Sequence, residues 1–257
     1  MTAAGARWWE RAAARWTDAL VCVGQSERAA GLAAGISAPF VVVPNGVDLT
    51  RWVPASEADK QEARARFGLG PEPIALCVGR LTKQKGQDLL VASWRQVRDL
   101  IPDARLILVG DGIDRAALER DAGPGVELVG HSEDVAGWIA ASDVIVLPSR
   151  WEGMSLALLE AMARARPVVA TDVAGMREVL AGGGGEVVPI GDPSALARAI
   201  ASRLGNRQIL AAEGVRGRKT IEEHHDLNAT TDRIAQVYAE VLDRRADHVY
   251  PKDRRRR

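Results

Sequence analysis

Apolar and polar segments alternate regularly from residue 74 onward. Short apolar runs rich in β-branched residues are each followed by Gly or polar residues and then by an Ala/Leu-rich stretch. Such continuously apolar runs are typical of strands covered on both faces, and their alternation with helices requires right-handed crossovers and a parallel sheet. The pattern therefore predicts a doubly wound α/β domain. Its six predicted strands are 74–79, 105–110, 126–130, 143–149, 167–172 and 185–192.

The helical stretches carry their own boundary signals. Stretch 87–100 ends shortly before Pro102, and stretch 193–204 begins at Pro193 and ends at Gly205. Proline fits the first turn of a helix but not its interior, and glycine commonly follows the last turn. A helix is therefore predicted over each stretch. Beyond the last strand the chain remains helical to about residue 242, with an apolar stripe of Ile234, Val237, Tyr238 and Val241.

The regions outside the main domain are shorter and more irregular. Residues 1–50 hold a Trp/Arg/Ala-rich helix and two strand–helix steps, which make a small, incomplete α/β segment. The polar, Pro/Gly-punctuated stretch 51–72 predicts a linker with one short helix. The main domain is assigned to 73–220. Residues 221–245 are predicted to be a helix packing toward the first segment, and 246–257 a basic, disordered tail.

Composition excludes several classes of protein. The 257 residues carry 34 Lys and Arg against 34 Asp and Glu, with 47% hydrophobic residues. That balance predicts a folded globular protein and argues against a dedicated nucleic-acid binder. Cys22 and Cys77 lie in apolar runs without metal-ligand spacing and predict buried thiols in a reducing compartment. Apolar stretches fall short of the roughly 18 residues that span a bilayer, so a cytoplasmic location is expected.

A tryptophan- and arginine-rich stripe near the start leaves one question of location open. Trp8, Trp9 and Trp16 accompany Arg11 and Arg15. Such a helix either lies on a membrane surface, which would place the chain at the inner membrane face, or covers the sheet of a domain. The second interpretation is preferred.

Two cationic side chains follow the first predicted strand of the main domain. Arg80 and Lys85 lie in the loop 79–86, and Gly86 opens the next helix. Ligands of open parallel sheets bind beyond the carboxyl ends of the strands. Cations beside free helix N–H groups there predict a phosphate site. The loop lacks the GK[ST] of a Walker loop. A solvated loop is the alternative.

Two carboxylates surround the start of the helix after the fourth strand. Glu152 precedes this helix and Glu160 falls in its second turn, among apolar neighbours. An ionised carboxylate in such surroundings needs hydroxyl or N–H donors, which a ribose diol supplies. Gly153 permits close approach of a ligand to the backbone. The alternative is that both carboxylates pair with Arg150 or Arg164.

A third loop, 130–135, follows the third strand with small and polar residues. These side chains are able to reach the edge of a nucleotide base. Asp134 is equally suited to capping the next helix.

Five motifs follow one another along the chain: PNGVD at 44–48, GRLTKQKG at 79–86, VGDG at 109–112, LPSRWEGMSLALLEAMA at 147–163 and PVVATDVAGMREVL at 167–180. This series resembles the donor-binding half of glycosyltransferase family 4, over about residues 15–243. The resemblance implies the GT-B architecture of two Rossmann-like domains. It also implies transfer of a sugar from a UDP- or GDP-linked donor with retention at the anomeric carbon, without a metal or cofactor.

The resemblance assigns roles to residues at matching positions. It makes Arg80 and Lys85 the diphosphate clamp and places Glu152 at the donor sugar. Further donor-binding residues are Gly79, Gly153, Met154, Ser155, Leu156 and Glu160, with Glu160 on the ribose. The base is expected near His131, Ser132 and Glu133. The acceptor is unknown.

A full member of this family has a further domain before this one, of which about 48 residues are present. Catalysis by the chain alone is therefore expected to be incomplete. The explanations left open are a truncated product, one half of a split transferase completed by a second chain, and a non-catalytic nucleotide-sugar-binding subunit.

Sugar transfer fits the sequence better than two other activities. A dinucleotide oxidoreductase is disfavoured because Arg115 replaces the third glycine of GxGxxG, and Asp111 and Asp114 would repel a pyrophosphate. A nucleotide-sugar epimerase remains an alternative. In EEHHD (222–226), His224 and His225 point about 100° apart on a helix, which favours a surface helix end over a metal site.

Overall fold

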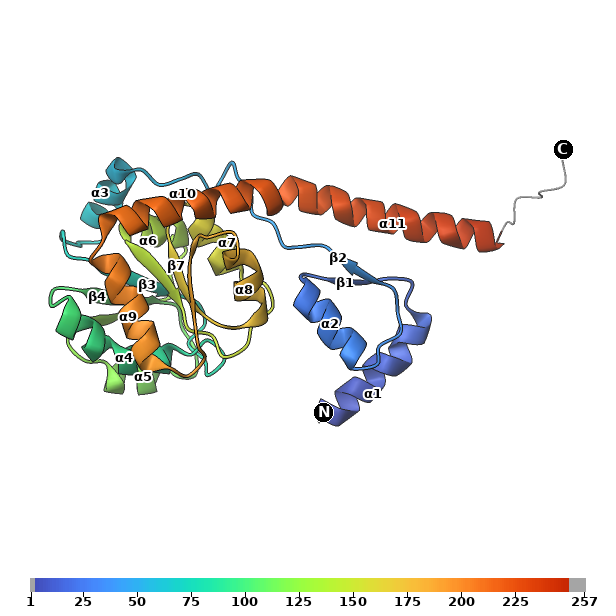
Figure 1. Cartoon of the computed structure of the whole chain (residues 1–257), viewed down its shortest axis with the longest axis horizontal. Helices are drawn as coiled ribbons and strands as arrows, with labels where there is room; N and C mark the ends of the chain where they lie inside the picture. Colours follow the sequence, from blue (N-terminus) through green and yellow to red (C-terminus); the bar gives the residue numbers. More distant parts are fainter. Residues whose placement is uncertain (1–2, 250–257) are drawn as a thin grey trace. The chain divides into compact units, whose positions relative to one another are not determined.

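The computed structural model describes residues 3–249, with side chains for residues 8–245, and divides the chain into two compact units. The larger unit is Val47–Asp226. The smaller unit combines the described residues up to Gly46 with those from Leu227 onward. Figure 1 shows the elements of both in sequence colours.

The larger unit contains a six-stranded sheet in which all neighbouring strands are parallel (Figure 1). Its strand order is β5-β4-β3-β6-β7-β8. The strands are β3 (Ile74–Val78), β4 (Arg105–Val109), β5 (Val126–Gly130), β6 (Val144–Leu147), β7 (Val168–Thr171) and β8 (Gly185–Val188). The predicted doubly wound α/β fold and its six strands are confirmed.

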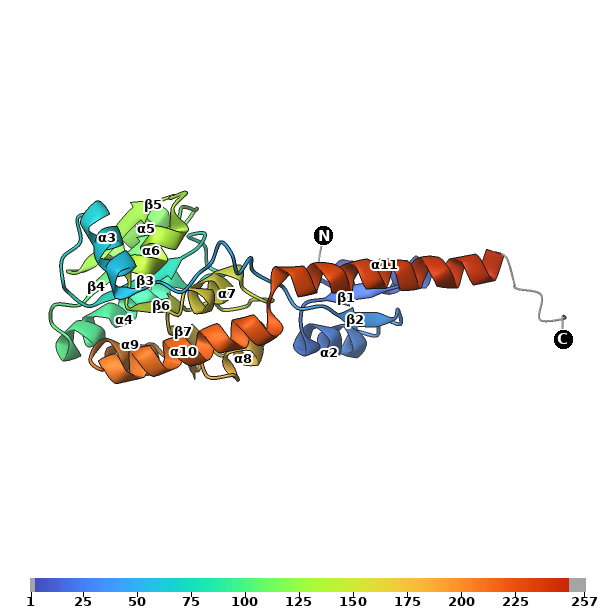
Figure 2. The same cartoon turned by 90° about the horizontal axis from the view of Figure 1, so that it is seen from above.

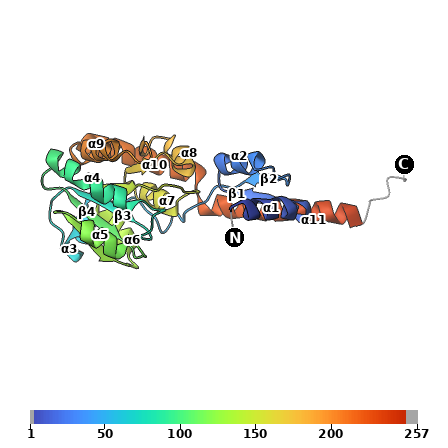
Figure 3. The ribbon, with the colours of Figure 1, turned by 90° about the horizontal axis from the view of Figure 1, so that it is seen from below.

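Successive strand residues face two separate cores, because side chains alternate across a strand. Ile74 and Leu76 of β3 face one core, whereas Ala75 and Cys77 face the other. The second core is covered by α4 (Gln87–Leu100), α5 (Arg115–Asp121) and α9 (Pro193–Leu204), with α4 packed against α9 (Figure 3). The predicted helices 87–100 and 193–204 are thus confirmed at both ends.

The first core is covered by helices on the opposite face of the sheet. They are α6 (Val135–Ala141), α7 (Leu156–Ala163), α8 (Ala174–Leu180) and α10 (Arg207–His224), with α10 packed against α7 (Figure 2). Burial raises the pKa of the Cys77 thiol to about 12. Cys22 is also buried, so both cysteines are core residues, as predicted.

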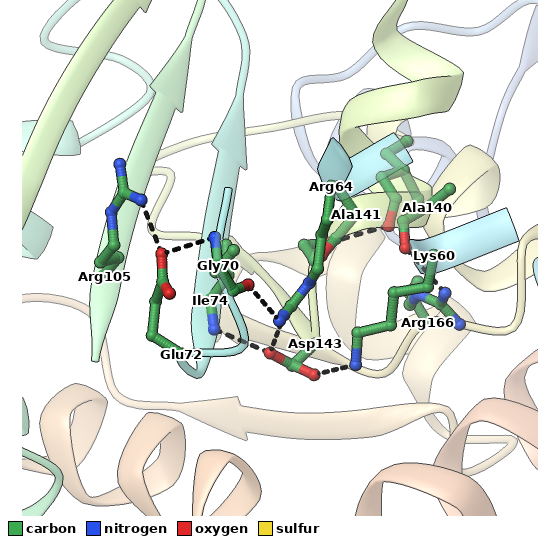
Figure 4. Close-up of polar contacts among 12 residues, drawn as sticks. Lys60, Arg64, Gly70, Glu72, Ile74, Arg105, Ala140, Ala141, Asp143 and Arg166 are labelled. Atoms are coloured by element: carbon green, nitrogen blue, oxygen red, sulfur yellow. Dashed lines mark hydrogen bonds and ion pairs between the residues drawn. The ribbon is translucent and has the colours of Figure 1, made fainter. Parts of the chain in front are cut away.

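The stretch 51–72 differs from the predicted linker because it is built into the larger unit. Its helix α3 (Glu57–Arg66) starts at a capping box between Ser56 and Asp59 and packs against α6. Asp143, just before β6, joins this helix to the base of the sheet (Figure 4).

One carboxylate makes three contacts in that junction. Asp143 Oδ2 accepts hydrogen bonds from Arg64 Nη2 at 2.9 Å and from the Ile74 main-chain N–H at 2.7 Å. Its Oδ1 pairs with Lys60. Because these side chains are largely buried, losing one partner would leave an uncompensated charge. The polar stretch 51–72 is therefore part of the folded larger unit.

The smaller unit contains a parallel pair of strands, β1 (Leu20–Cys22) and β2 (Phe40–Val42). Its helices are α1 (Ala3–Ala13), α2 (Gln25–Ala33) and α11 (Leu227–Val249), with a 3-10 turn η1 (Ala14–Trp16). Thr230 Oγ1 of α11 donates to the Pro44 carbonyl oxygen at 3.1 Å.

Some expectations for the ends of the chain differ from the structure. Helix α11 continues through residues 246–249 of the predicted tail, and the rest of that tail lies outside the described residues. Of the predicted stripe on α11, Val237 is buried but Tyr238 is 68% exposed, since neighbouring helix positions point about 100° apart. His224 is exposed at the end of α10, as expected for a surface helix end, whereas His225 is buried. No helix among residues 3–249 combines the length and apolarity needed to cross a bilayer.

Candidate functional site

The predicted site residues surround the carboxyl ends of β3 and β6, the two central strands of the sheet. These strands pair in parallel, with Leu76 beside Ile145. From β3 the chain winds to β4 and β5 on one side, and from β6 it winds to β7 and β8 on the other. This reversal is a topological switch point, where the two departing loops leave a crevice for a ligand.

Main-chain hydrogen bonds shape the loop after β3. The Gly79 N–H donates to the Val109 carbonyl oxygen at 2.9 Å, and the Leu81 N–H donates to that of Asp111 at 2.9 Å. These bonds tie the loop to the loop after β4. The backbone is therefore held in place on both sides of Arg80.

A glycine allows this loop to meet the loop after β6. Gly86 has a φ of +70°, and a Cβ at this position would lie 2.1 Å from the Pro148 carbonyl oxygen. Any other residue would clash with the backbone and strain its own conformation. Gly86 thus brings the start of α4 against the end of β6.

Arg150 fastens the same two loops together. Its guanidinium forms two hydrogen bonds with the Asp88 carboxylate, at 2.7 and 2.6 Å, and a third with the Lys83 carbonyl oxygen at 2.8 Å. Gln84 Nε2 donates to the Trp151 carbonyl oxygen at 3.1 Å. Arg150 is therefore engaged with Asp88, and the alternative that it pairs with the predicted acidic residues is wrong.

Two of the predicted site residues touch each other. Lys85 Nζ lies 2.7 Å from Glu152 Oε1, and the two side chains are 20% and 11% exposed. The loops after β3 and β6 thus bring together one predicted cation and one predicted carboxylate. The alternative of a solvated loop at 79–86 does not fit the largely buried contact that Lys85 makes with Glu152.

Buried polar atoms without partners occur in this ion pair, in the loop after β3 and at the start of α4. Glu152 Oε2, Thr82 Oγ1 and Gln87 Oε1 are three of the six such atoms in the part of the chain with described side chains. A buried acceptor without a donor is unfavourable, and an explanation is needed where several occur together. A hydroxyl group of a ligand would supply a donor to Glu152 Oε2.

Arg80 is exposed in the same loop as Lys85. Among residues 8–245, no hydrogen bond or ion pair to its guanidinium is present, and the Arg80 carbonyl oxygen accepts a bond from Gln87 Nε2 at 3.0 Å. A guanidinium at a switch point is suited to bidentate binding of phosphate oxygens.

Glu160 lies in the second turn of α7, the helix that follows β6. Leu158, Leu159 and Ala161 beside it are fully buried. This burial raises the pKa of the Glu160 carboxyl to about 7, although the positive charge of Arg51 opposes the shift. Arg51 was not predicted as a site residue, since it lies more than 100 positions earlier in the sequence.

The raised pKa predicts a pH-dependent stability difference. Between about pH 4.5 and 7 the unfolded chain releases the Glu160 proton, whereas the folded chain still holds it. The stability of the folded chain therefore falls as the pH rises through this range, and the loss is complete above about pH 7, where folded Glu160 carries its unfavourable charge. With a discount for its partial exposure, Glu160→Gln should be about 1 to 2 kcal/mol more stable than the parent chain at pH 8 and nearly equal at pH 5. Urea unfolding at both pH values measures this difference.

Glu62 provides the control for this comparison. It lies exposed on α3, so Glu62→Gln should show no such dependence on pH. An equal difference at both pH values for Glu160→Gln would contradict the raised pKa.

The residues from Gly153 to Leu156 form the start of α7. Gly175 packs so closely against this turn that a Cβ there would lie 1.6 Å from the Gly153 carbonyl oxygen. Met154 is half-buried, Ser155 is buried, and Leu156 is 53% exposed. Ser155 occupies the N-cap position, but its side chain makes no capping hydrogen bond. The first helical turn therefore keeps its attraction for an anion.

The predicted base-binding residues lie further along the same edge. His131, Ser132 and Glu133 follow β5, two strands from β3 and so about 10 Å along the sheet. Ser132 Oγ accepts a bond from Trp138 Nε1 at 3.2 Å. Asp134 Oδ1 accepts one from the Gly137 N–H at 2.8 Å and so caps α6. His131 and Glu133 are exposed and make no contact with the Lys85–Glu152 pair in the described structure.

A cavity of about 660 Å³ lies at the opposite edge of the sheet, before β3, β6 and β7. Its lining includes Lys60, Arg64 and Asp143, the ion network shown in Figure 4. The charges there pair with one another, and the network holds α3 on the sheet. None of the predicted site residues lines this cavity.

Two family models match the chain. One is described as "Glycosyl transferases group 1" and covers residues 72–206, which is more than half of the chain. The other is described as "Glycosyltransferase Family 4" and covers residues 2–51.

Curated relatives extend beyond this chain. It is 33% identical over 224 residues to the lipopolysaccharide core biosynthesis mannosyltransferase LpsB of Rhizobium meliloti, covering 82% of this chain and 63% of that protein. It is 31% identical over 211 residues to a GDP-mannose-dependent monoacylated α-(1-6)-phosphatidylinositol monomannoside mannosyltransferase of Corynebacterium glutamicum, covering 77% of this chain and 55% of that protein. The chain thus spans roughly three fifths of the length of these relatives.

Solved structures agree in fold. Sucrose-phosphate synthase of Thermosynechococcus elongatus superposes with a TM-score of 0.83 at 28% identity, over 93% of this chain and 62% of that one. Anabaena HepE, solved with UDP and glucose, superposes with a TM-score of 0.84 at 23% identity, over 93% and 67% of the two chains, and shows the fold alone. From its motifs, its two family models and its parallel sheet, the chain belongs to the group 1, family 4 glycosyltransferases of the GT-B type.

Proposed function

We propose that the larger unit binds the nucleoside diphosphate of a nucleotide-sugar donor at the carboxyl ends of β3 and β6. The observation that carries this proposal is the Lys85–Glu152 contact at the switch point, with the second Glu152 oxygen buried and unpartnered. In this arrangement Arg80 and Lys85 bind the diphosphate. Glu152 Oε2 accepts a hydrogen bond from a hydroxyl of the donor sugar, and Glu160 accepts hydrogen bonds from the hydroxyls of the ribose.

The same residues promote departure of the diphosphate. As the glycosidic C–O bond of the donor breaks, negative charge grows on the phosphate oxygens. Two fixed cations and the N–H groups at the start of α7 stabilise that charge more in the transition state than in the ground state. The reaction proposed is transfer with retention, in which the chain's own cations serve in place of a metal ion.

The donor is proposed to carry UDP or GDP. One curated relative is named as dependent on GDP-mannose, and one structural neighbour was solved with UDP and glucose. The exposed side chains of His131 and Glu133 would meet the base. Because the chain spans only part of its relatives' length, acceptor binding is proposed to use residues beyond this chain, in the same polypeptide or in a second chain.

Calorimetric titration of the whole chain with UDP, GDP, ADP and NAD, with and without EDTA, tests this function. We expect UDP or GDP to bind, with an affinity that EDTA leaves unchanged, and the corresponding nucleoside to bind far more weakly. Tighter binding of NAD than of either diphosphate would contradict the proposal, as would loss of diphosphate binding in EDTA.

A further inference from the structure

Gln87 is a buried polar residue to which the proposed function gives no role. It is the first residue of α4 and is only 2% exposed. Its Nε2 donates a hydrogen bond to the Arg80 carbonyl oxygen at 3.0 Å. Its Oε1 is buried and has no partner. The amide thus reaches back from the helix to the residue that carries the exposed guanidinium.

The contacts around Arg80 are otherwise made by the main chain. The residues on either side are held by N–H bonds from Gly79 and Leu81 to the loop after β4, and the Leu81 side chain is buried. Among residues 8–245, Gln87 supplies the side-chain hydrogen bond to the Arg80 backbone. Together with the Leu81 N–H bond to Asp111, which belongs to the same peptide unit, it holds the peptide plane that follows Arg80, and with it the direction in which the Arg80 side chain leaves the chain.

This amide brings an energetic disadvantage as well as a contact. A buried acceptor without a donor disfavours the folded state, and an apolar side chain of similar size would remove that penalty. Simple stabilisation of α4 is thus a poor account of a glutamine at this position. Orientation of the Arg80 carbonyl is the benefit that its geometry shows.

We propose that Gln87 is a positioning residue, which holds the Arg80 backbone so that the guanidinium faces the diphosphate. This inference rests on the proposed function, because it assigns the purpose of the contact to phosphate binding. Gln87 itself is not expected to touch the donor. Its effect should pass entirely through Arg80.

A double-mutant cycle tests this dependence on Arg80. Gln87→Met keeps the length of the side chain but removes both polar atoms. In titrations with UDP and GDP we expect it to weaken diphosphate binding about tenfold. In the Arg80→Ala background the same substitution should change the affinity less than about twofold. Binding of the nucleoside monophosphate should be affected less than binding of the diphosphate.

Thermal unfolding separates positioning from a structural role. Gln87→Met should unfold within about 3 °C of the parent chain, because removal of the unpartnered Oε1 offsets loss of the hydrogen bond to the Arg80 carbonyl oxygen. Gln61→Met, on the exposed face of α3, is the matched control and should leave affinity unchanged.

Every outcome of the double-mutant cycle either supports or overturns the positioning role of Gln87. A tenfold loss that disappears in the Arg80→Ala background supports the proposal. An equal loss in both backgrounds would overturn it, as would unchanged affinity or a loss that follows a lower unfolding temperature. If the parent chain binds UDP or GDP but Arg80→Ala does not weaken binding, Gln87 has nothing to position and the inference fails alone. If the parent chain binds neither nucleotide, the proposed function itself fails.

Discussion

Replacing Lys85 by methionine should weaken binding of UDP or GDP by about 100-fold to 1,000-fold, the cost of removing one partner of a buried charge pair and the largest effect expected of any single substitution here. The substitution removes a cation that binds the diphosphate. It also leaves the Glu152 carboxylate unpaired, with one oxygen already buried and unpartnered. An anion would then have to approach an uncompensated negative charge. Calorimetric titration of the variant measures the loss.

Neighbouring residues provide the controls for this prediction. Lys83 lies exposed in the same loop, and Lys83→Met removes an equal charge without disturbing the ion pair. It should weaken binding no more than about threefold, as expected for a screened surface charge. Adding Glu152→Gln to Lys85→Met should recover part of the diphosphate affinity, because the unpaired charge is gone. Equal losses at Lys83 and Lys85 would show that only the net charge of the loop matters.

Arg80→Ala should weaken binding of the same nucleotides about 100-fold, through loss of charge-assisted hydrogen bonds to the phosphate oxygens. Its guanidinium is exposed and makes no ion pair in the described part of the chain. The free energy of unfolding should therefore stay within about 0.5 kcal/mol of the parent value. Titration and urea unfolding of the same preparation measure the two quantities.

Arg95, exposed on α4, gives the matched substitution for Arg80. Arg95→Ala should leave nucleotide affinity unchanged. The role given to Arg80 would be wrong if the two variants lost affinity equally, or if Arg80→Ala lost affinity only because it unfolded.

Much of the sheet could be predicted because its signals are local. The apolar runs gave the six strands, and the proline and glycine signals placed both ends of helices 87–100 and 193–204. The short helix predicted in segment 51–72 is present as α3, but the segment is part of the larger unit rather than a linker, because its anchoring depends on a distant residue. Lys60 and its partner Asp143 stand 83 positions apart, and no local pattern reveals such a contact.

The residues of the candidate site could be predicted from the sequence, but the contacts between them could not. The motifs identified Lys85 and Glu152, yet their contact depends on β3 lying beside β6, which the order of strands along the chain does not specify. Arg51 was missed because it acts on Glu160, which is far from it in the sequence, whereas Gln87 was missed although it lies only seven positions after Arg80. The available signal for Gln87 was an amide side chain directly after Gly86, at the start of the helix that follows the Arg80 loop.

We propose above that the diphosphate binds between the loops after β3 and β6. A crystal structure of the chain grown with UDP or GDP tests this most directly. We expect phosphate oxygens within hydrogen-bonding distance of the Arg80 guanidinium and Lys85 Nζ, at the start of α7. Phosphate density in the cavity beside Lys60 and Arg64, with Arg80 and Lys85 left uncontacted, would contradict it.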